Sequence, residues 1–279
     1  MIIVLGRSKD ALFLFGGIGM KVSVLVENTT CDPFFAAEHG LSLYIETRGL
    51  RLLFDTGATG AFADNADKMG IALSEVDTLI LSHGHYDHGG GLETFLRCNS
   101  SAPVYLSRYA FAEHYNGAGN DIGLPQHLQN NPRLMFVDGP LTLAPGITLD
   151  CCFKRSPKYP LETFGLQVRK EGEFCPETFD HELYLVVEEE RKICFSGCAH
   201  RGVENILHWL TPDVLVGGFH FKQLSPGDQR LELAAQRLQE FPCQYYTCHC
   251  TGQAQYAYLK ERLGERLHYL STGDRVEIK

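Results

Sequence analysis

The most informative residues of this chain form one short run, Ser82-His83-Gly84-His85-Tyr86-Asp87-His88-Gly89-Gly90-Gly91. Imidazole nitrogens and carboxylate oxygens are ligands that suit zinc or a similar divalent metal. Because buried imidazoles and carboxylates need partners, packing alone does not explain so many of them in one place. His83 and His85 lie two apart, so on an extended segment they point the same way. Asp87 and His88 follow the turn and can serve a second metal, so the run predicts a metal site rather than a histidine-rich surface loop.

Two later segments repeat the pattern of an apolar strand that leads into a polar turn. Residues 193–197 precede Cys198 and His200, and residues 244–247 precede His249. Active sites of layered α/β folds collect where strands end and helices begin. A single histidine at such a place can equally cap a helix or bind a carbonyl, so these turns alone leave both roles open.

Length, charge and composition limit the classes of protein that the chain can belong to. With 279 residues and 44% hydrophobic content, it can bury a large core as one domain or two tightly fused halves. A net charge of −9 argues against a nucleic-acid surface, which needs Lys and Arg. It does not exclude a small anionic substrate, because bound metal ions reverse the local field. No apolar run is long enough for a membrane span, so the expected partner is a small molecule, with no nucleic acid and no membrane.

Ten cysteines raise the question of a disulfide framework, but their placement argues against it. Cys151 and Cys152 are adjacent, and Cys248 and Cys250 flank His249. The chain is also far longer than the small domains that depend on disulfides for stability. We therefore expect reduced thiols in a cytoplasmic protein.

The first nineteen residues are expected to stand apart from the rest. Their apolar segment, residues 11–15, follows charged residues and lacks a convincing signal-peptide cleavage site. We interpret residues 1–19 as an upstream extension or a misplaced start, with a short strand at the sheet edge as the alternative. Residues 20–279 are expected to form a single domain.

The remaining elements alternate between strands and helices joined by short turns, as in a layered α/β protein. Residues 116–132 are rich in Gly, Asn and Gln and are expected to form a long exposed loop. Strands are expected at 22–26, 42–46, 51–54, 76–81 and 104–106 and as hairpins within 141–150 and 183–195, and helices at 61–69, 92–97, 108–115, 203–209, 225–241 and 253–263.

The order of these motifs resembles the signature of the metallo-β-lactamase superfamily of metal-dependent hydrolases. The resemblance runs from about residue 20 to the C-terminus, and a narrower likeness is to the subgroup labelled dihydropterin aminobenzene-phosphate synthase-like. The fold that it implies is α/β, a four-layer αββα sandwich of two mixed β-sheets with flanking helices and with the metals at one edge. The matching segments are 53–57, 82–91, 195–200 and 246–252, and for the subgroup 38–42, 197–200, 217–220 and 249–252.

The resemblance also implies a set of metal ligands. Asp87 and His200 would take part in catalysis as well, and Asp55 would hydrogen-bond the histidine loop and fix the imidazole orientation. One or two Zn²⁺ ions are expected, with Mn²⁺ or Fe²⁺ as alternatives, because imidazole-rich sets favour zinc. The implied ligands are His83, His85, Asp87, His88, His200 and His249.

One departure from the superfamily pattern concerns the turn after the strand at 193–197. Many relatives carry a histidine in a Pro-Gly-His-Thr turn and a bridging aspartate at a Gly-Asp pair, whereas this chain has Gly197-Cys198-Ala199-His200. Either His200 takes a ligand position that another residue fills elsewhere, or Cys198 coordinates as a thiolate. His181 is a second candidate for the missing histidine, unless its acidic neighbours simply mark the exposed start of a strand.

The chemistry implied is hydrolysis by a metal-activated hydroxide of a small phosphodiester, ester or lactone. A synthase or lyase acting on a pterin or aminobenzene ribosyl phosphate is the first alternative, and a non-catalytic metal-binding sensor is the second. His39 and His220 are candidate substrate contacts, with a structural role as the alternative for each. Arg201 is a candidate contact for an anionic group, with an ordinary exposed basic residue as the favoured alternative.

Overall fold

The computed structural model describes residues 19–279, and the expectations for residues 1–18 lie outside the described residues. The first strand, β1 (Met20–Val26), begins where the family resemblance begins. Among the residues that the structure describes, every helix is too short or too polar to cross a lipid bilayer.

The first large sheet is mixed. Its strands β17, β1, β2 and β3 are antiparallel neighbours, and from β3 onward the neighbours are parallel. Within residues 19–279 its seven strands lie in the order β17 (Arg275–Ile278), β1, β2 (Ser42–Thr47), β3 (Leu50–Phe54), β4 (Thr78–Ile80), β5 (Val104–Ser107) and β7 (Leu134–Val137).

The second large sheet is also mixed. Strands β13 to β16 are parallel neighbours, whereas β8, β9, β12 and β13 pair antiparallel. For the described part of the chain, its seven strands lie in the order β16 (Leu267–Tyr269), β15 (Gln244–Thr247), β14 (Val214–Val216), β13 (Lys192–Phe195), β12 (Tyr184–Glu188), β9 (Ile147–Asp150) and β8 (Leu141–Ala144).

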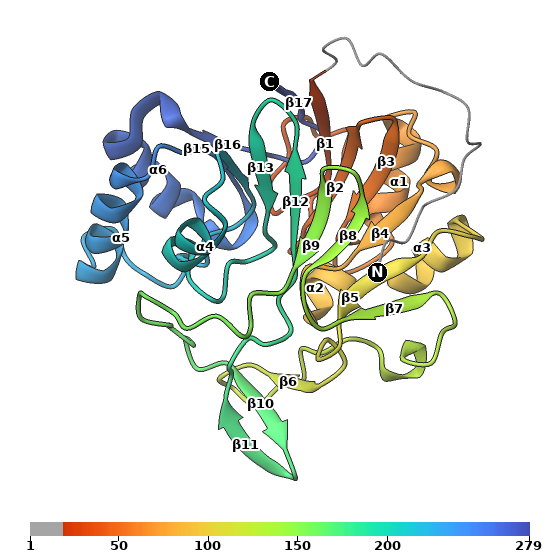
Figure 1. The fold of residues 1–279 in the computed structure, drawn as a ribbon, viewed down its shortest axis with the longest axis horizontal. Helices are drawn as coiled ribbons and strands as arrows, with labels where there is room; N and C mark the ends of the chain where they lie inside the picture. The colour runs from red at the N-terminus through yellow and green to blue at the C-terminus, as the bar shows by residue number, and fades with distance from the viewer. Residues whose placement is uncertain (1–18) are drawn as a thin grey trace.

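The two sheets pack face to face (Figure 1), and alternate side chains of their strands are buried between them. Val22 and Val24 of β1 point into this core, and Phe54 of β3 meets Phe195 of β13 with ring centroids 6.0 Å apart. Leu25, on the opposite face of β1, belongs to a separate apolar cluster under the helices. Each large side chain buried in this way contributes about 1.5–3 kcal/mol, so the alternating pattern fixes which face of each strand lies inward.

Helices cover the outer faces of both sheets, so the predicted four-layer αββα sandwich is confirmed (Figure 1). The helix N-cap expected at Ser225 lies three residues later, at Asp228, whose carboxylate accepts the Arg230 backbone N–H, and the helix itself begins at Gln229. The first sheet carries α1 (Ala61–Lys68) and α3 (Leu92–Cys98), and the second carries α4 (Val203–Leu210), α5 (Gln229–Glu240) and α6 (Gln253–Leu263).

A small three-stranded sheet projects from one end of the sandwich (Figure 1). It consists of β6 (Glu113–Tyr115), β10 (Gln167–Lys170) and β11 (Glu173–Pro176) within residues 19–279. The helix predicted at 108–115 is wrong, because residues 113–115 pair with β10 and Tyr115 packs edge-on against Phe174. Backbone pairing with a distant strand here overrides the local preference.

The segment 116–132 is less exposed than expected. Leu124 and Leu128 are buried, and Leu124 packs close to Gly89 at the end of α2 (Tyr86–Gly89). Short 3₁₀ turns lie at Leu73–Glu75, Gln126–Leu128, His249–Thr251 and Gly264–Arg266.

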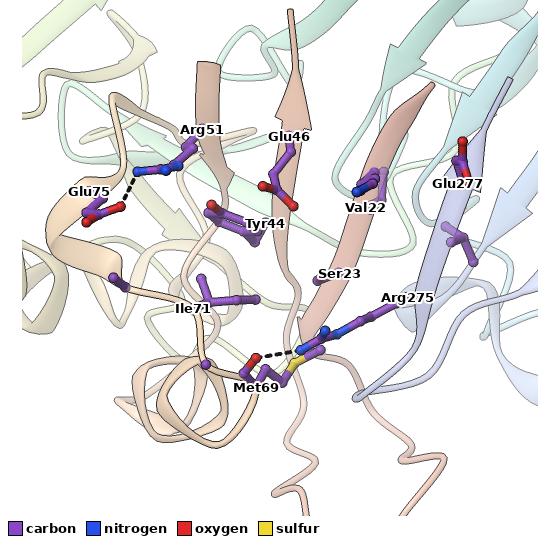
Figure 2. Close-up of a pocket in the computed structure, with 14 residues that line it drawn as sticks. Val22, Ser23, Tyr44, Glu46, Arg51, Met69, Ile71, Glu75, Arg275 and Glu277 are labelled. Carbon is purple, nitrogen blue, oxygen red and sulfur yellow. Dashed lines mark hydrogen bonds and ion pairs between the residues drawn. The ribbon is translucent and has the colours of Figure 1, made fainter. Parts of the chain in front are cut away.

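A groove of about 460 Å³ lies along strands β17, β1 and β2 of the first sheet (Figure 2). Both arginines that line it have protein partners: Arg51 pairs with Glu75, and Arg275 donates to the Met69 carbonyl (Figure 2). Among its described lining residues there is no histidine or cysteine, so the groove is separate from the candidate metal ligands.

Candidate metal centre

Turns that follow strands of both large sheets meet at one edge of the sandwich, beside α2 (Figure 1). The histidine run follows β4, Cys198 follows β13 and His249 follows β15. His88 Nε2 lies 3.2 Å from Cys198 Sγ and 3.2 Å from His249 Nε2, although these residues are 110 and 161 positions away in the chain. The fold therefore brings the three predicted motifs into one cluster.

The buried Asp55 carboxylate, which follows β3, holds the histidine run in place. Its Oδ1 accepts the Ser82 backbone N–H, and its Oδ2 accepts the Ser82 hydroxyl and His88 Nδ1, each at 2.7 Å. Asp55 has a φ of +63°, a strained backbone conformation that this network compensates. Both carboxylate oxygens are thus used within the protein, and Asp55 orients ligands rather than facing the metal positions.

Hydrogen bonds fix the tautomers of three histidines. Because the Ser82 hydroxyl donates to Asp55, its oxygen accepts His83 Nδ1–H at 2.8 Å. His88 Nδ1–H donates to Asp55, and His249 Nδ1–H donates to Asn28 Oδ1 at 2.8 Å. In its neutral form each ring therefore presents the lone pair of Nε2 to the centre of the cluster, which is the tautomer that a metal ligand needs.

The first set of donors consists of His83, His85 and His200, whose candidate ligand nitrogens lie within 4.8 Å of one another. All three side chains are buried, and residues 19–279 supply no hydrogen bond to Nε2 of any of them. Burial lowers the pKa of each imidazole well below 6.5, so the rings are neutral at neutral pH. Three neutral, buried nitrogens of this kind match a trihistidine metal site.

The second set consists of Asp87, His88 and His249, with Cys198 beside them. Asp87 Oδ2 lies 3.4 Å from His249 Nε2 and 4.0 Å from His88 Nε2. Burial lowers the pKa of His88, but the carboxylates of Asp55 and Asp87 outweigh it and raise the value to about 9. These carboxylates make the electrostatic potential negative at this point, which favours a positive charge there. A bound divalent cation would provide that charge.

A third group adjoins His85 and contains His181, which the sequence suggested, together with His114 and Glu177, which sequence reasoning missed. His114, on β6, donates Nδ1–H to the buried Glu177 carboxylate at 2.7 Å, and its ring stacks on His181 with centroids 4.0 Å apart. His181 Nδ1 accepts the Gly84 backbone N–H at 2.9 Å, so the neutral His181 ring carries its proton on Nε2. In this tautomer, His181 offers the cavity a donor and His114 offers an acceptor.

Arg201, a candidate contact for an anionic group, already interacts with other side chains of the protein. Its guanidinium is buried, pairs with Asp180 at 3.2 Å and lies over the Trp209 ring. Glu182, next to His181, is buried rather than exposed, and accepts the backbone N–H groups of His200 and Arg201. These contacts fix the turn that carries His200.

The other two candidate substrate contacts lie at the margin of the cluster. His39 is half-exposed, and its Nε2 is 3.4 Å from Asp87 Oδ2, so it stands at the open side of the second set. His220 packs against His200 with centroids 4.2 Å apart. His200 and His220 also line a cavity of about 130 Å³ whose walls include the aromatic rings of Phe164, Phe219 and Phe221.

Comparison with known proteins places this centre in a family. The model of the metallo-β-lactamase superfamily matches residues 37–238. MJ0448, an uncharacterized protein of Methanocaldococcus jannaschii, is 27% identical over 239 residues, which cover 83% of this chain and 90% of the relative. A protein of the same organism named 7,8-dihydropterin-6-methyl-4-(β-D-ribofuranosyl)-aminobenzene-5'-phosphate synthase is 27% identical over 266 residues, covering 85% of this chain and 90% of the relative.

Solved structures agree with this assignment. The crystal structure of Tm1679, described as a metal-dependent hydrolase of the β-lactamase superfamily, matches with a TM-score of 0.77 and 27% identity, covering 93% of this chain and 99% of the other. The metallo-β-lactamase fold protein YhfI from Bacillus subtilis shares the fold, with a TM-score of 0.58 and 16% identity over 93% of this chain and 99% of its own. The chain therefore belongs to the metallo-β-lactamase superfamily, whose divalent metal sites its His/Asp/Cys clusters match.

Proposed function

We propose that this protein is a metal-dependent hydrolase that acts on a small phosphodiester, ester or lactone. The observation that supports this proposal is the pairing of two buried donor sets, His83/His85/His200 and Asp87/His88/His249. Two adjacent sets fit one or two Zn²⁺ ions, with Mn²⁺ or Fe²⁺ as alternatives, because five of the six donors are imidazoles.

Metal chemistry would supply the nucleophile and the electrophilic activation. A divalent ion held by these donors would supply a water molecule of lowered pKa and would polarise a carbonyl or phosphoryl oxygen. The Asp87 carboxylate lies between His249 and His39, at 3.4 Å from each, and is placed to orient the attacking oxygen and hold its proton. His39 stands on the open side, where a leaving group departs, and so is the residue best placed to give that group a proton.

The substrate would be small and could be anionic. The buried Arg201 is already paired with Asp180, so the positive charge for an anion would come from the metal ions rather than from this arginine. The cavity beside His200 and His220 is lined largely by apolar and aromatic side chains, which suits a carbon-rich part of the substrate.

The proposed location is the cytoplasm. All ten cysteines lie in the part of the chain that the structure describes, and each has a free thiol there. Reduced thiols are typical of reducing compartments.

A synthase is the second candidate, because the relative that carries a synthase name is 27% identical over 85% of this chain. That activity would join or cleave a pterin or aminobenzene ribosyl phosphate at the same donor sets. A non-catalytic metal sensor would retain the donor sets without turnover.

The decisive experiment tests hydrolysis by zinc- and manganese-loaded protein. The panel holds chromogenic forms of a phosphodiester, a phosphomonoester, a carboxylic ester and a lactone. Asp87→Asn keeps the side-chain volume but removes the negative charge, so we expect kcat/KM to fall by about 10²–10⁴. Asp64→Asn, at an exposed position on α1, is the matched control and should retain full activity.

The outcomes separate the candidate functions. Turnover that disappears with Asp87→Asn supports the hydrolase, and the preferred substrate reports whether the site selects an anion. Metal-loaded protein that is silent across the panel would reject this hydrolase and favour the synthase or the sensor. Equal turnover in both variants would remove Asp87 from the mechanism.

A further inference from the structure

Three side chains at the margin of the metal centre form a group that the two donor sets do not explain. Cys198 follows β13, His220 follows β14 and Cys250 lies in the 3₁₀ turn after β15. One candidate ligand atom from each, two sulfurs and one imidazole nitrogen, lies within 4.8 Å of the other two. Three consecutive parallel strands of the second sheet therefore each contribute one donor.

The chemistry of this group differs from that of its neighbours. The two thiols are 2% and 5% exposed, and no residue in 19–279 supplies a hydrogen bond to either ring nitrogen of His220, although both nitrogens are buried. Buried imidazole nitrogens without partners are costly unless a ligand satisfies them. Two cysteine sulfurs with one histidine nitrogen form a soft donor set that selects Zn²⁺ and related metals.

The backbone around Cys250 is shaped to hold its sulfur. The His220 backbone N–H donates to Cys250 Sγ at 3.2 Å, a contact that stabilises a thiolate. A Cβ on Gly218 would lie 2.3 Å from the same sulfur, so glycine is needed there to make room. His220 has a φ of +56°, and such strain is retained in proteins where surrounding contacts enforce it, often at functional sites.

We propose that Cys198, His220 and Cys250 form a further metal position with thiolate ligands, adjoining the second donor set. Binding one divalent ion there releases two protons, one from each thiol, and leaves the fourth coordination position open. Cys198 Sγ is 3.2 Å from His88 Nε2, so its thiolate joins this position to the second set. The group His85/His114/His181 has similar spacing but is a different case, because His181 Nδ1 accepts a backbone N–H and its Nε2 holds the proton.

The test uses the full chain, reduced and kept free of oxygen, with Co²⁺ as a visible substitute for zinc. A cysteine thiolate bound to Co²⁺ gives a charge-transfer absorption band in the near ultraviolet, which imidazole and carboxylate ligands do not give. We expect this band in the wild type and about half of it in Cys250→Ala, because the ion between the two sulfurs is lost and only Cys198, which adjoins the second donor set, still contacts Co²⁺. Cys250→Ala and His220→Ala should each bind one equivalent of Co²⁺ less than the wild type.

Cys248→Ala is the matched control. Cys248 is buried two residues from Cys250, but its side chain belongs to the apolar core between the sheets. It should retain the full band and the full cobalt content. Circular dichroism of the metal-free variants shows whether each is folded, and His220→Ala gives an independent answer if Cys250→Ala is not.

Two results would overturn the proposal. One is a fully loaded wild type with no thiolate band, and the other is a band and a cobalt content that Cys250→Ala leaves unchanged. Both readouts are independent of turnover, so failure of the hydrolase assay would not affect this result, and a missing band would not by itself reject hydrolysis at the two donor sets.

Discussion

In three histidines of this centre, the nitrogen that faces the metal position is set by a residue on the other side of the ring. Asp55, Ser82 and Asn28 each accept a hydrogen bond from an Nδ1, on His88, His83 and His249 respectively. An imidazole has only one proton when neutral, so accepting it at Nδ1 leaves a lone pair at Nε2. The metal-binding capacity of the run therefore depends on residues that need not touch a metal.

Asp55→Asn should weaken metal binding by about 10- to 100-fold while leaving the fold intact. The amide retains the volume, but its NH₂ group would face donors that the carboxylate now accepts, and the charge beside His88 is lost. Competition with a fluorescent zinc chelator measures the change. Asp77→Asn is the control, because Asp77 accepts the Arg51 backbone N–H far from the centre. Equal zinc affinity in both variants would contradict this role for Asp55.

Sequence spacing locates some residues of the site and not others. The histidine run is visible because its chemistry is concentrated in a few positions, and the ends of apolar strands point to His200 and His249. His114 and its partner Glu177 are 63 positions apart in the chain, and nothing local links them. They meet only because β6 pairs with β10, which is a long-range event that local patterns do not encode.

Among the elements, long strands with alternating burial and helices with clear capping signals were predictable. Very short strands, and strands that form only by pairing with a distant segment, were not. The helix predicted at 253–263 is present with those bounds as α6, and β15 was predicted over 244–247. Strand β14 has only three residues, Val214–Val216, which is too short for a periodic signal. Strand β6 pairs with β10, which is far away in the chain, so its own sequence does not reveal it and instead resembles that of a helix.

The β10–β11 hairpin turns through two residues, Glu171 and Gly172, with φ of +52° and +89°. Glycine adopts this region freely, and asparagine tolerates it better than glutamate does. Glu171→Asn should therefore stabilise the protein against unfolding, by about 0.5 kcal/mol. The midpoint of urea denaturation measures the effect, with Glu173→Asn, outside the turn, as the comparison. A lower midpoint for Glu171→Asn would show that the turn does not select this conformation.

At the scale of the whole molecule, the centre joins the two sheets. The histidine run comes from the first sheet, and Cys198, His200 and His249 come from the second. A Cβ on Gly197 would lie 2.1 Å from Ser82 Oγ, which shows how closely the turns of the two sheets approach. A metal ion bound by donors of both sheets would hold them together.

Metal removal should therefore lower the stability of the whole fold rather than of one loop. A ligand that binds only the folded state stabilises it by about 4 kcal/mol when its free concentration is 1,000 times Kd. Thermal unfolding with and without a chelator should show a higher Tm for the zinc-loaded protein. The increase should be smaller for Asp87→Asn, which lacks one donor. An unchanged Tm after verified zinc loading would mean that the metals do not connect the sheets.

The pairing of β17 with β1 has a consequence for how the protein is made. Met20 lies opposite Ile278 in this pair, so strands from the two ends of the described chain are neighbours. During synthesis β1 leaves the ribosome long before β17, and until β17 follows, one edge of β1 lacks its partner among the strands that the structure describes. The donor-bearing turns after β13 and β15 also emerge late. A nascent chain is therefore exposed to pairing with other chains along β1 until β17 has emerged, and loss of residues 275–278 would make that exposure permanent.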